Sequence, residues 1–185
     1  MSKTDANFYY ISLIGSHPDK KHKTTHQIST IGENMSIRRV EYLSIENGIV
    51  ASYMHNSLTP SLGKIGVLVT LNSKADTKFL KDLGKQIAMH IAATKPLSVS
   101  KEKLDPAIIQ KERKILTQQA IDTGKPKEIV EKMLDGRMRK YFEEVCLLDQ
   151  TFVIDGENKV EKVLELAAKE VGESIKISDF RIFVL

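Results

Sequence analysis

The chain has 185 residues, of which 41% are hydrophobic and 28% charged, and its formal net charge is +4. These values are typical of a globular protein with one domain or two small ones. The single cysteine, Cys146, excludes an intramolecular disulfide framework, and no apolar run reaches the roughly 18 residues of a membrane span. Lys and Glu are interleaved through most of the chain and aromatic residues make up only 6%, which argues against direct nucleic-acid binding.

Residues 1–30 differ in character from the rest of the chain. The short apolar stretch Phe8–Leu13 is followed by Gly15–Lys23, which combines Gly, Pro and several lysines and predicts an exposed loop or arm. His22 and His26 are four residues apart, but the segment is a poor helix former, so we expect a solvated loop rather than a metal site. The lysines are expected to be solvated, with contact to nucleic acid as the alternative.

A run of strands follows. Residues 37–45 alternate as a half-buried strand does, Asn47-Gly48 is a strong hairpin signal, and 49–56 reads as the returning strand. The segment 59–63 carries turn residues, and 65–71 alternates again. Three successive strands with short connections predict an antiparallel meander.

Helices occupy the next part of the chain. Asp76 is placed to cap a helix that ends at Lys95-Pro96, and Asp105-Pro106 starts another. Gly124 and Pro126 then break the chain between two amphipathic segments with apolar residues at spacings of three and four. We therefore expect an antiparallel helical hairpin over about 105–145.

The end of the chain predicts a return to the sheet. Phe152–Ile154 is interpreted as a short strand, an amphipathic helix ends at Gly172, and Ile175–Leu185 is interpreted as a closing strand with a bulge near Asp179. The predicted fold class is α+β: a two-layer antiparallel sheet of three or more strands, with helices on one face and a protruding antiparallel helical hairpin. Because the chain stops within a predicted strand, we expect it to be part of a longer protein.

The residues do not predict an enzyme active site. The sequence contains no phosphate-binding Gly-rich loop, no Cys/His set with zinc spacing and no Gly-x-Ser-x-Gly elbow. Cys146 lies among apolar neighbours and is expected to be a buried structural thiol. His55, taken alone, is expected to be an ordinary surface histidine. No cofactor or metal is expected.

Several strings, in order along residues 31–185, resemble the translation elongation factor Ts family. They are Ile31–Val40 (IGENMSIRRV), Ser52–His55 (SYMH), Ile65–Val69 (IGVLV), Ile87–Pro96 (IAMHIAATKP), and Gly124–Met133 (GKPKEIVEKM) continuing through Gly136–Lys140 (GRMRK). The last falls where that family joins the two helices of its coiled-coil arm. By this resemblance, residues 31–185 are a core subdomain with the arm at about 105–145, and residues 1–30 are a diverged arm or a remnant of the first half of the core.

The resemblance implies a guanine-nucleotide exchange factor that binds elongation factor Tu in translation elongation. Such a factor binds the nucleotide-free GTPase more tightly than the nucleotide-bound GTPase, and linkage then lowers the affinity for GDP by the same factor. The family achieves this by wedging side chains so that the Mg²⁺ and phosphate contacts of the GTPase are lost. The resemblance therefore implies a factor that acts by binding and not by enzymatic chemistry.

The resemblance also implies a partner-binding site. His55 falls on the family's Tyr-x-His position, which contributes to the contact with the GTPase, and Met54 and Asn56 flank it. Because alternate residues of a strand share a face, Tyr53 and His55 are expected on one side and Met54 on the other. We predict a partner-binding set of Tyr53, Met54, His55 and Asn56, with Tyr53 and His55 as its centre.

The chain departs from the family pattern in ways that leave a second reading open. Nothing matches the family's small N-terminal helical domain, its C-terminal helical module or its Thr-Asp-Phe-Val motif; Phe8 lies three residues after Thr4-Asp5 and does not match its register. The alternative is a truncated binding or dimerisation module without exchange activity, forming a homodimer through exposed sheet edges. Without an Arg-rich, acid-poor leader, the expected location is the bacterial cytoplasm, without membrane attachment.

Overall fold

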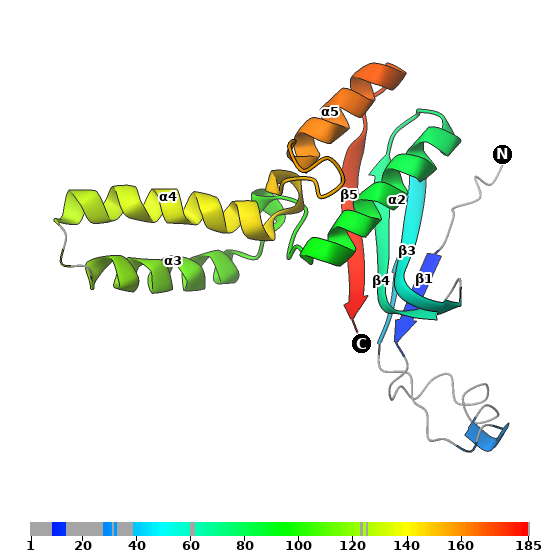
Figure 1. The fold of residues 1–185 in the computed structure, drawn as a ribbon, viewed down its shortest axis with the longest axis horizontal. Coiled ribbons are helices and arrows are strands. Elements are labelled where there is room, and N and C mark those ends of the chain that lie inside the picture. The colour runs from blue at the N-terminus through cyan, green and yellow to red at the C-terminus, as the bar shows by residue number, and fades with distance from the viewer. Residues whose placement is uncertain are drawn as a thin grey trace. The chain divides into compact units, whose positions relative to one another are not determined.

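A computed structural model of the chain describes residues 9–13, 28–30, 32, 39–59, 62–122, 124 and 126–184 (Figure 1). The chain divides into two units, Met1–Ala92 with Glu173–Leu185, and Ala93–Gly172. Among the described residues, no helix is long and apolar enough to cross a lipid bilayer.

The first unit is built mainly of strands. It contains β1 (Tyr9–Leu13), β2 (Arg39–Leu43), β3 (Gly48–Thr59), β4 (Leu62–Asn72), most of α2 (Thr77–Thr94) and β5 (Lys176–Val184). Strands β3, β4 and β5 form an antiparallel sheet in that order, and β1 pairs with β2 in a separate antiparallel ribbon. The predicted α+β class, the antiparallel sheet and the closing strand are confirmed.

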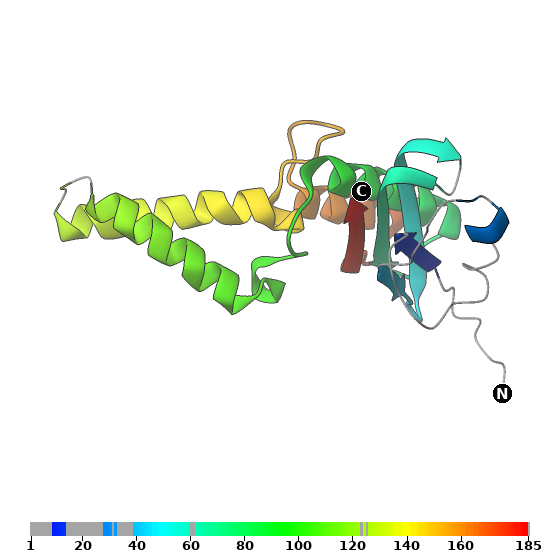
Figure 2. The same ribbon diagram turned by 90° about the horizontal axis from the view of Figure 1, so that it is seen from below.

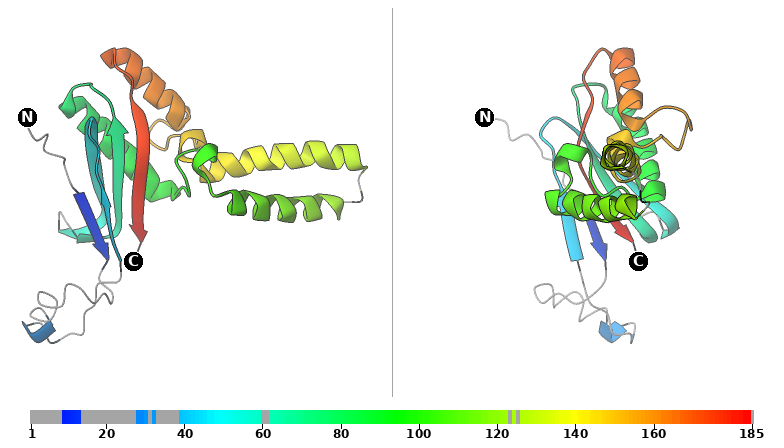
Figure 3. Two further views of the ribbon diagram at one scale, coloured as in Figure 1. Left: turned by 180° about the vertical axis from the view of Figure 1, so that it is seen from behind. Right: turned by 90° about the vertical axis from the view of Figure 1, so that its left-hand side faces the viewer.

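One face of the sheet is covered by α2. Alternate residues of β4 on this face, Val67, Val69 and Leu71, are at most 1% exposed. Gly84 lets the helix approach closely, since a Cβ built there would lie 2.6 Å from the Cβ of Ala51 on β3. Figures 1 and 3 show α2 in front of the sheet in one view and behind it in the other.

The opposite face carries β2. Leu43 packs in a cluster with Val50, Leu68 and Phe183, each at most 6% exposed. Arg181 of β5 donates from Nε to Glu41 of β2 over 3.3 Å, on the same side of the sheet. The strand therefore lies across the face of the sheet and joins it by side chains, not by extending its hydrogen-bond ladder.

The predicted meander is wrong at its first step. Strand β2 pairs with β1, which the sequence reading had not predicted as a strand, and it does not form a hairpin with β3. Gly48 is still required at this position, but not because it closes a hairpin turn. Gly48 has φ +126°, and a Cβ built there would overlap the carbonyl oxygen of Leu71. The glycine permits a close approach to β4 at the start of β3, instead of closing a turn.

The predicted bulge near Asp179 is confirmed. The register of β4 and β5 shifts between Thr70 and Leu71, whose partners are Asp179 and Ile177. The buried hydroxyl of Thr70 donates to the carbonyl of Asp179 over 2.9 Å and accepts from its N–H over 2.8 Å. The side chain therefore satisfies the backbone groups that the bulge removes from the ladder.

The second unit is helical. It contains η2 (Lys101–Lys103), α3 (Pro106–Ile121), α4 (Lys127–Val145), η3 (Leu147–Asp149) and α5 (Val160–Val171). The predicted hairpin is present: Asp105 Oδ1 accepts from the N–H of Ala107 over 2.8 Å at the start of α3, and Gly124 has φ +68° between α3 and α4. Buried Ala120 of α3 and Val130 and Leu134 of α4 form its seam.

Backbone hydrogen bonds tie the base of the hairpin together. The N–H of Leu97 donates to the carbonyl of Val145, and the N–H of Leu147 donates to the carbonyl of Ser98, over 2.8 and 2.9 Å. Buried Gln150 donates from Nε2 to the carbonyl of Glu144 over 2.6 Å. These bonds fix where α4 ends.

The short strand predicted at Phe152–Ile154 is wrong. This segment begins a turn in which Asp155 Oδ1 accepts from the N–H groups of Glu157 and Asn158 over 3.0 and 3.2 Å. The side chain competes with a β-ladder for the local backbone donors. The helix α5 follows and ends, as predicted, at Gly172, which has φ +72°.

Candidate partner-binding site

The four residues of the predicted site are consecutive on β3. This strand pairs with β4 along one edge, and no other described strand pairs with its second edge. The register sets Tyr53 opposite Val67, Met54 opposite Gly66 and His55 opposite Ile65. The site therefore lies on an edge strand, towards its connection with β4.

Tyr53 and His55 form a pair on one face of the strand. The Oη of Tyr53 lies 3.1 Å from Nδ1 of His55, and the ring centroids are 6.0 Å apart at 44°. Tyr53 is half-buried and His55 exposed. If the phenol donates this hydrogen bond, the proton of the neutral imidazole sits on Nε2 and is available to a partner. The predicted shared face is confirmed; the binding role remains a prediction.

Met54 and Asn56 differ from that pair. Successive side chains of a strand point to opposite faces, so Met54 lies on the face opposite Tyr53 and His55. Its side chain is half-buried. Asn56 is exposed and has φ +50°, in the left-handed region that Asn tolerates better than most residues. The four residues therefore divide between the two faces.

The backbone around His55 depends on a glycine of the neighbouring strand. A Cβ built on Gly63 would lie 2.8 Å from the carbonyl oxygen of His55 and 3.5 Å from the Cβ of Met54. Any larger residue would push the strands apart here. Together with the φ of Asn56, this contact fixes the course of β3 just after the histidine.

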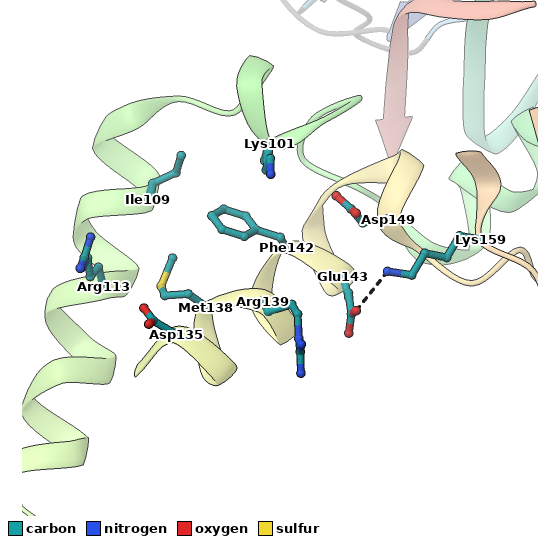
Figure 4. A pocket seen from close by; sticks show the side chains of 10 residues that line it. All are labelled: Lys101, Ile109, Arg113, Asp135, Met138, Arg139, Phe142, Glu143, Asp149 and Lys159. Atoms are coloured by element: carbon teal, nitrogen blue, oxygen red, sulfur yellow. Dashed lines mark hydrogen bonds and ion pairs between the residues drawn. The ribbon is translucent and has the colours of Figure 1, made fainter. Parts of the chain in front are cut away.

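The second unit contains a pocket of about 470 Å³ between α3 and α4. Figure 2 shows that α3 and α4 diverge with distance from the end at which they are connected. The apolar lining comes from Ile109, Met138 and Phe142, and Figure 4 shows the Phe142 ring between Ile109 and Lys101. Sequence reasoning missed this pocket because it treated the apolar stripe as a closed seam.

Charged side chains surround the pocket. Glu143 and Lys159 form an ion pair of 3.1 Å, whereas Arg113, Asp135 and Arg139 make none with any residue that the structure describes. No group of three His, Cys, Asp or Glu able to hold a metal occurs in the described ranges. The pocket can bind an apolar group with charged ends, but its lining offers no nucleophile with an adjacent base.

Cys146 is a free, buried thiol, as predicted. Burial raises the pKa of this thiol to about 11, and the negative charges of Asp149 and Glu102 add to the shift. It is therefore in the unreactive thiol form at neutral pH. His22, His26, the lysines near Lys20, and Phe8 with Thr4-Asp5 lie outside the described residues.

The model of a family described as Elongation factor TS matches residues 9–185. The chain is 55% identical to the Elongation factor Ts of Rhodospirillum centenum over 161 residues, which are 87% of this chain and 52% of that protein. It is 49% identical to that of Paramagnetospirillum magneticum over 171 residues, 92% of this chain and 55% of that protein.

A third relative agrees. The Elongation factor Ts of Rhodospirillum rubrum is 51% identical over 163 residues, 88% of this chain and 53% of that protein. The chain spans about half the length of the curated relatives that it matches.

Proposed function

Because this chain belongs to the elongation factor Ts family across residues 9–185, we propose that it binds elongation factor Tu and promotes the release of GDP. The activity requires binding alone. A factor that binds the nucleotide-free GTPase tenfold more tightly than the GDP-bound form lowers the affinity for GDP tenfold, which corresponds to about 1.4 kcal/mol. The relatives are bacterial, which supports a bacterial cytoplasmic location.

We propose that the Tyr53–His55 pair on β3 contacts the GTPase. The observation that supports it is the 3.1 Å contact between Oη and Nδ1, which orients an exposed imidazole on an edge strand. An imidazole held by a neighbour loses less conformational entropy on binding than a freely rotating one. Asn56 and Met54 are proposed to flank the contact, Asn56 beside the histidine and Met54 from the other face.

The test is the affinity of the chain for nucleotide-free elongation factor Tu, measured by titration calorimetry. His55→Ala is expected to weaken binding about tenfold, as truncation of a central interface residue does. Its melting temperature should not change, because the side chain is exposed. Tyr53→Phe keeps the ring and removes Oη, so a smaller loss of about threefold is expected if the tyrosine orients the imidazole.

Gln86→Ala, an exposed change on α2, is the matched control and should bind as the parent does. An unchanged dissociation constant for His55→Ala would remove the histidine from the contact.

The alternative is a module that self-associates and does not exchange nucleotide. The observation in its favour is that no strand among the described residues pairs with the second edge of β3, since unpaired edges template strand pairing. Sedimentation velocity with and without elongation factor Tu separates the two proposals. A heterocomplex supports the exchange factor, and a homodimer that forms no heterocomplex supports the alternative.

A further inference from the structure

The hydrogen bond between Tyr53 and His55 determines which ring nitrogen of the histidine a partner can meet. The Oη atom of Tyr53 lies 3.1 Å from Nδ1, and neither ring makes another hydrogen bond or an ion pair with a residue that the structure describes. A phenol is a good proton donor with a weakly basic oxygen, whereas an unprotonated imidazole nitrogen is a strong acceptor. In the neutral pair the phenol therefore donates to Nδ1, and the imidazole proton lies on Nε2.

The contact also accommodates a charged imidazole. Histidine changes its charge between about pH 5 and 8, and both nitrogens of the imidazolium are donors. The phenol oxygen has acceptor capacity as well, so rotation about the Cζ–Oη bond lets Tyr53 accept a hydrogen bond from Nδ1–H. The bond then reverses its direction while Nε2 keeps its proton. Nε2 of His55 is therefore a donor in both charge states.

The surroundings of the pair contain no competing charge. Its two rows across the sheet are otherwise apolar: the register sets Val67 and Ile182 beside Tyr53, and Ile65 and Val184 beside His55. Lys64 of β4 and Arg181 of β5 alternate to the opposite face. Helix α2 covers the same face as the pair, and its ionisable residues form no hydrogen bond or ion pair with either ring; they are Lys78, Lys81, Asp82, Lys85 and His90.

The phenol of Tyr53 is thus the only ionisable group within the described part of the chain that is bonded to His55. The histidine is exposed, and Nδ1 is occupied by the phenol. A partner that approaches the ring along a polar direction therefore meets Nε2–H.

We propose that Tyr53 is a positioning residue that makes Nε2 of His55 a hydrogen-bond donor in both charge states, and that the group it meets on the GTPase is an acceptor without a proton of its own. A backbone carbonyl and a carboxylate both have this chemistry. The inference rests on the proposed binding of elongation factor Tu and specifies the chemistry of that contact. A donor of the GTPase aimed at Nε2 would meet a second proton, so the proposal excludes it.

The first experiment reads the protonation state in the free chain. Long-range ¹H–¹⁵N correlation spectra of the chain labelled with ¹⁵N-histidine, recorded at about pH 8, show which ring nitrogen carries the proton. His55→Ala identifies the signals of this residue. We expect an unprotonated Nδ1 and a protonated Nε2. Tyr53→Phe should shift the Nδ1 resonance of His55, because this nitrogen loses its hydrogen bond, and should leave the other histidines unchanged.

The second experiment measures affinity for nucleotide-free elongation factor Tu between about pH 5.5 and 8, for the parent and for His55→Ala. The quantity of interest is the ratio of the two dissociation constants, because titrating groups that both complexes share cancel in it. A ratio of about ten is expected at the alkaline end, and it should persist at the acidic end. A ratio that stays within about twofold of this value assigns a carbonyl, and a rise of about tenfold in acid assigns a carboxylate, which pairs with the imidazolium.

The outcomes separate this inference from the proposed function. A proton on Nδ1 in the free chain, or a ratio that falls to one in acid, would overturn the inference alone, since the second result means that Nε2 accepts a hydrogen bond from the GTPase. Gln86→Ala should match the parent across the whole pH range. The absence of any complex with elongation factor Tu would overturn the proposed function, and this inference with it.

Discussion

Gly84 offers a quantitative test of how α2 packs on the sheet. A Cβ built at this position would lie 2.6 Å from the Cβ of Ala51, 3.2 Å from Cδ1 of Leu71 and 3.4 Å from Cδ1 of Ile49. The nearest of these atoms is attached directly to the backbone of β3 and cannot turn aside. Gly84→Ala must therefore push the helix away from the strand.

The net effect is a difference between two opposing contributions. Overpacking in a well-packed core costs about 1–3 kcal/mol, and alanine gains about 0.8–1 kcal/mol over glycine within a helix. Gly84→Ala is therefore expected to lower the free energy of unfolding by about 1 kcal/mol, with about 2 kcal/mol as the upper end. Gly136→Ala, which has the same change in open space, is expected to raise it by about 1 kcal/mol.

The measurement is urea-induced unfolding followed by circular dichroism at 222 nm, with both variants and the parent under one set of conditions. Opposite signs for the two substitutions are expected. A Gly84→Ala variant more stable than the parent, as Gly136→Ala is expected to be, would refute the packing of α2 against β3 described above.

Further substitutions test the caps, the core and the thiol. Asp76→Ala removes the Oδ1 that accepts two N–H groups in the first turn of α2, and should lower the unfolding free energy by about 1 kcal/mol; no change in urea midpoint would show that the cap contributes nothing. Leu68→Ala empties the cluster beneath β2 and should cost about 2–5 kcal/mol, and a loss below about 1 kcal/mol would mean that the ribbon does not cover this face. The folded pKa of Cys146, about 11, exceeds its ordinary value of 9.0, so its contribution to stability is complete below pH 9 and is lost as pH rises towards 11. Cys146→Ala should remove this loss, so that its unfolding free energy depends less on pH between 9 and 11 than that of the parent. Rapid reaction of the native thiol with a disulfide reagent at pH 8 would contradict the burial.

Local signals in the sequence predicted much of this fold. Asp76 and Asp105 marked helix starts because a short acidic side chain satisfies N–H groups that the helix cannot. Gly124 marked the hairpin turn because its backbone has a positive φ. The alternation of side chains along a strand was sufficient to place Tyr53 and His55 on one face, and their side chains do form a contact. In each case a neighbour in sequence sets the conformation.

The failures came from long-range contacts. Asn47-Gly48 resembles a hairpin turn, but the glycine is needed because its Cα passes the carbonyl of Leu71. Nothing near β2 in the sequence reveals that it pairs with β1. The pocket beside Phe142 arises from the angle between α3 and α4, and the periodicity of either helix alone does not contain that angle. The turn after Phe152 did carry a local signal, the Asp155 side chain beside Gly156, which its apolar neighbours obscured.

The most direct test of the proposed function is the rate at which elongation factor Tu releases a fluorescent GDP analogue, measured by stopped flow with excess unlabelled nucleotide. A micromolar excess of this chain is expected to accelerate release, and His55→Ala is expected to reduce the acceleration while Gln86→Ala does not. Release at the intrinsic rate, from a GTPase shown by sedimentation to be bound, would contradict exchange activity and leave a chain that binds the GTPase without displacing its nucleotide.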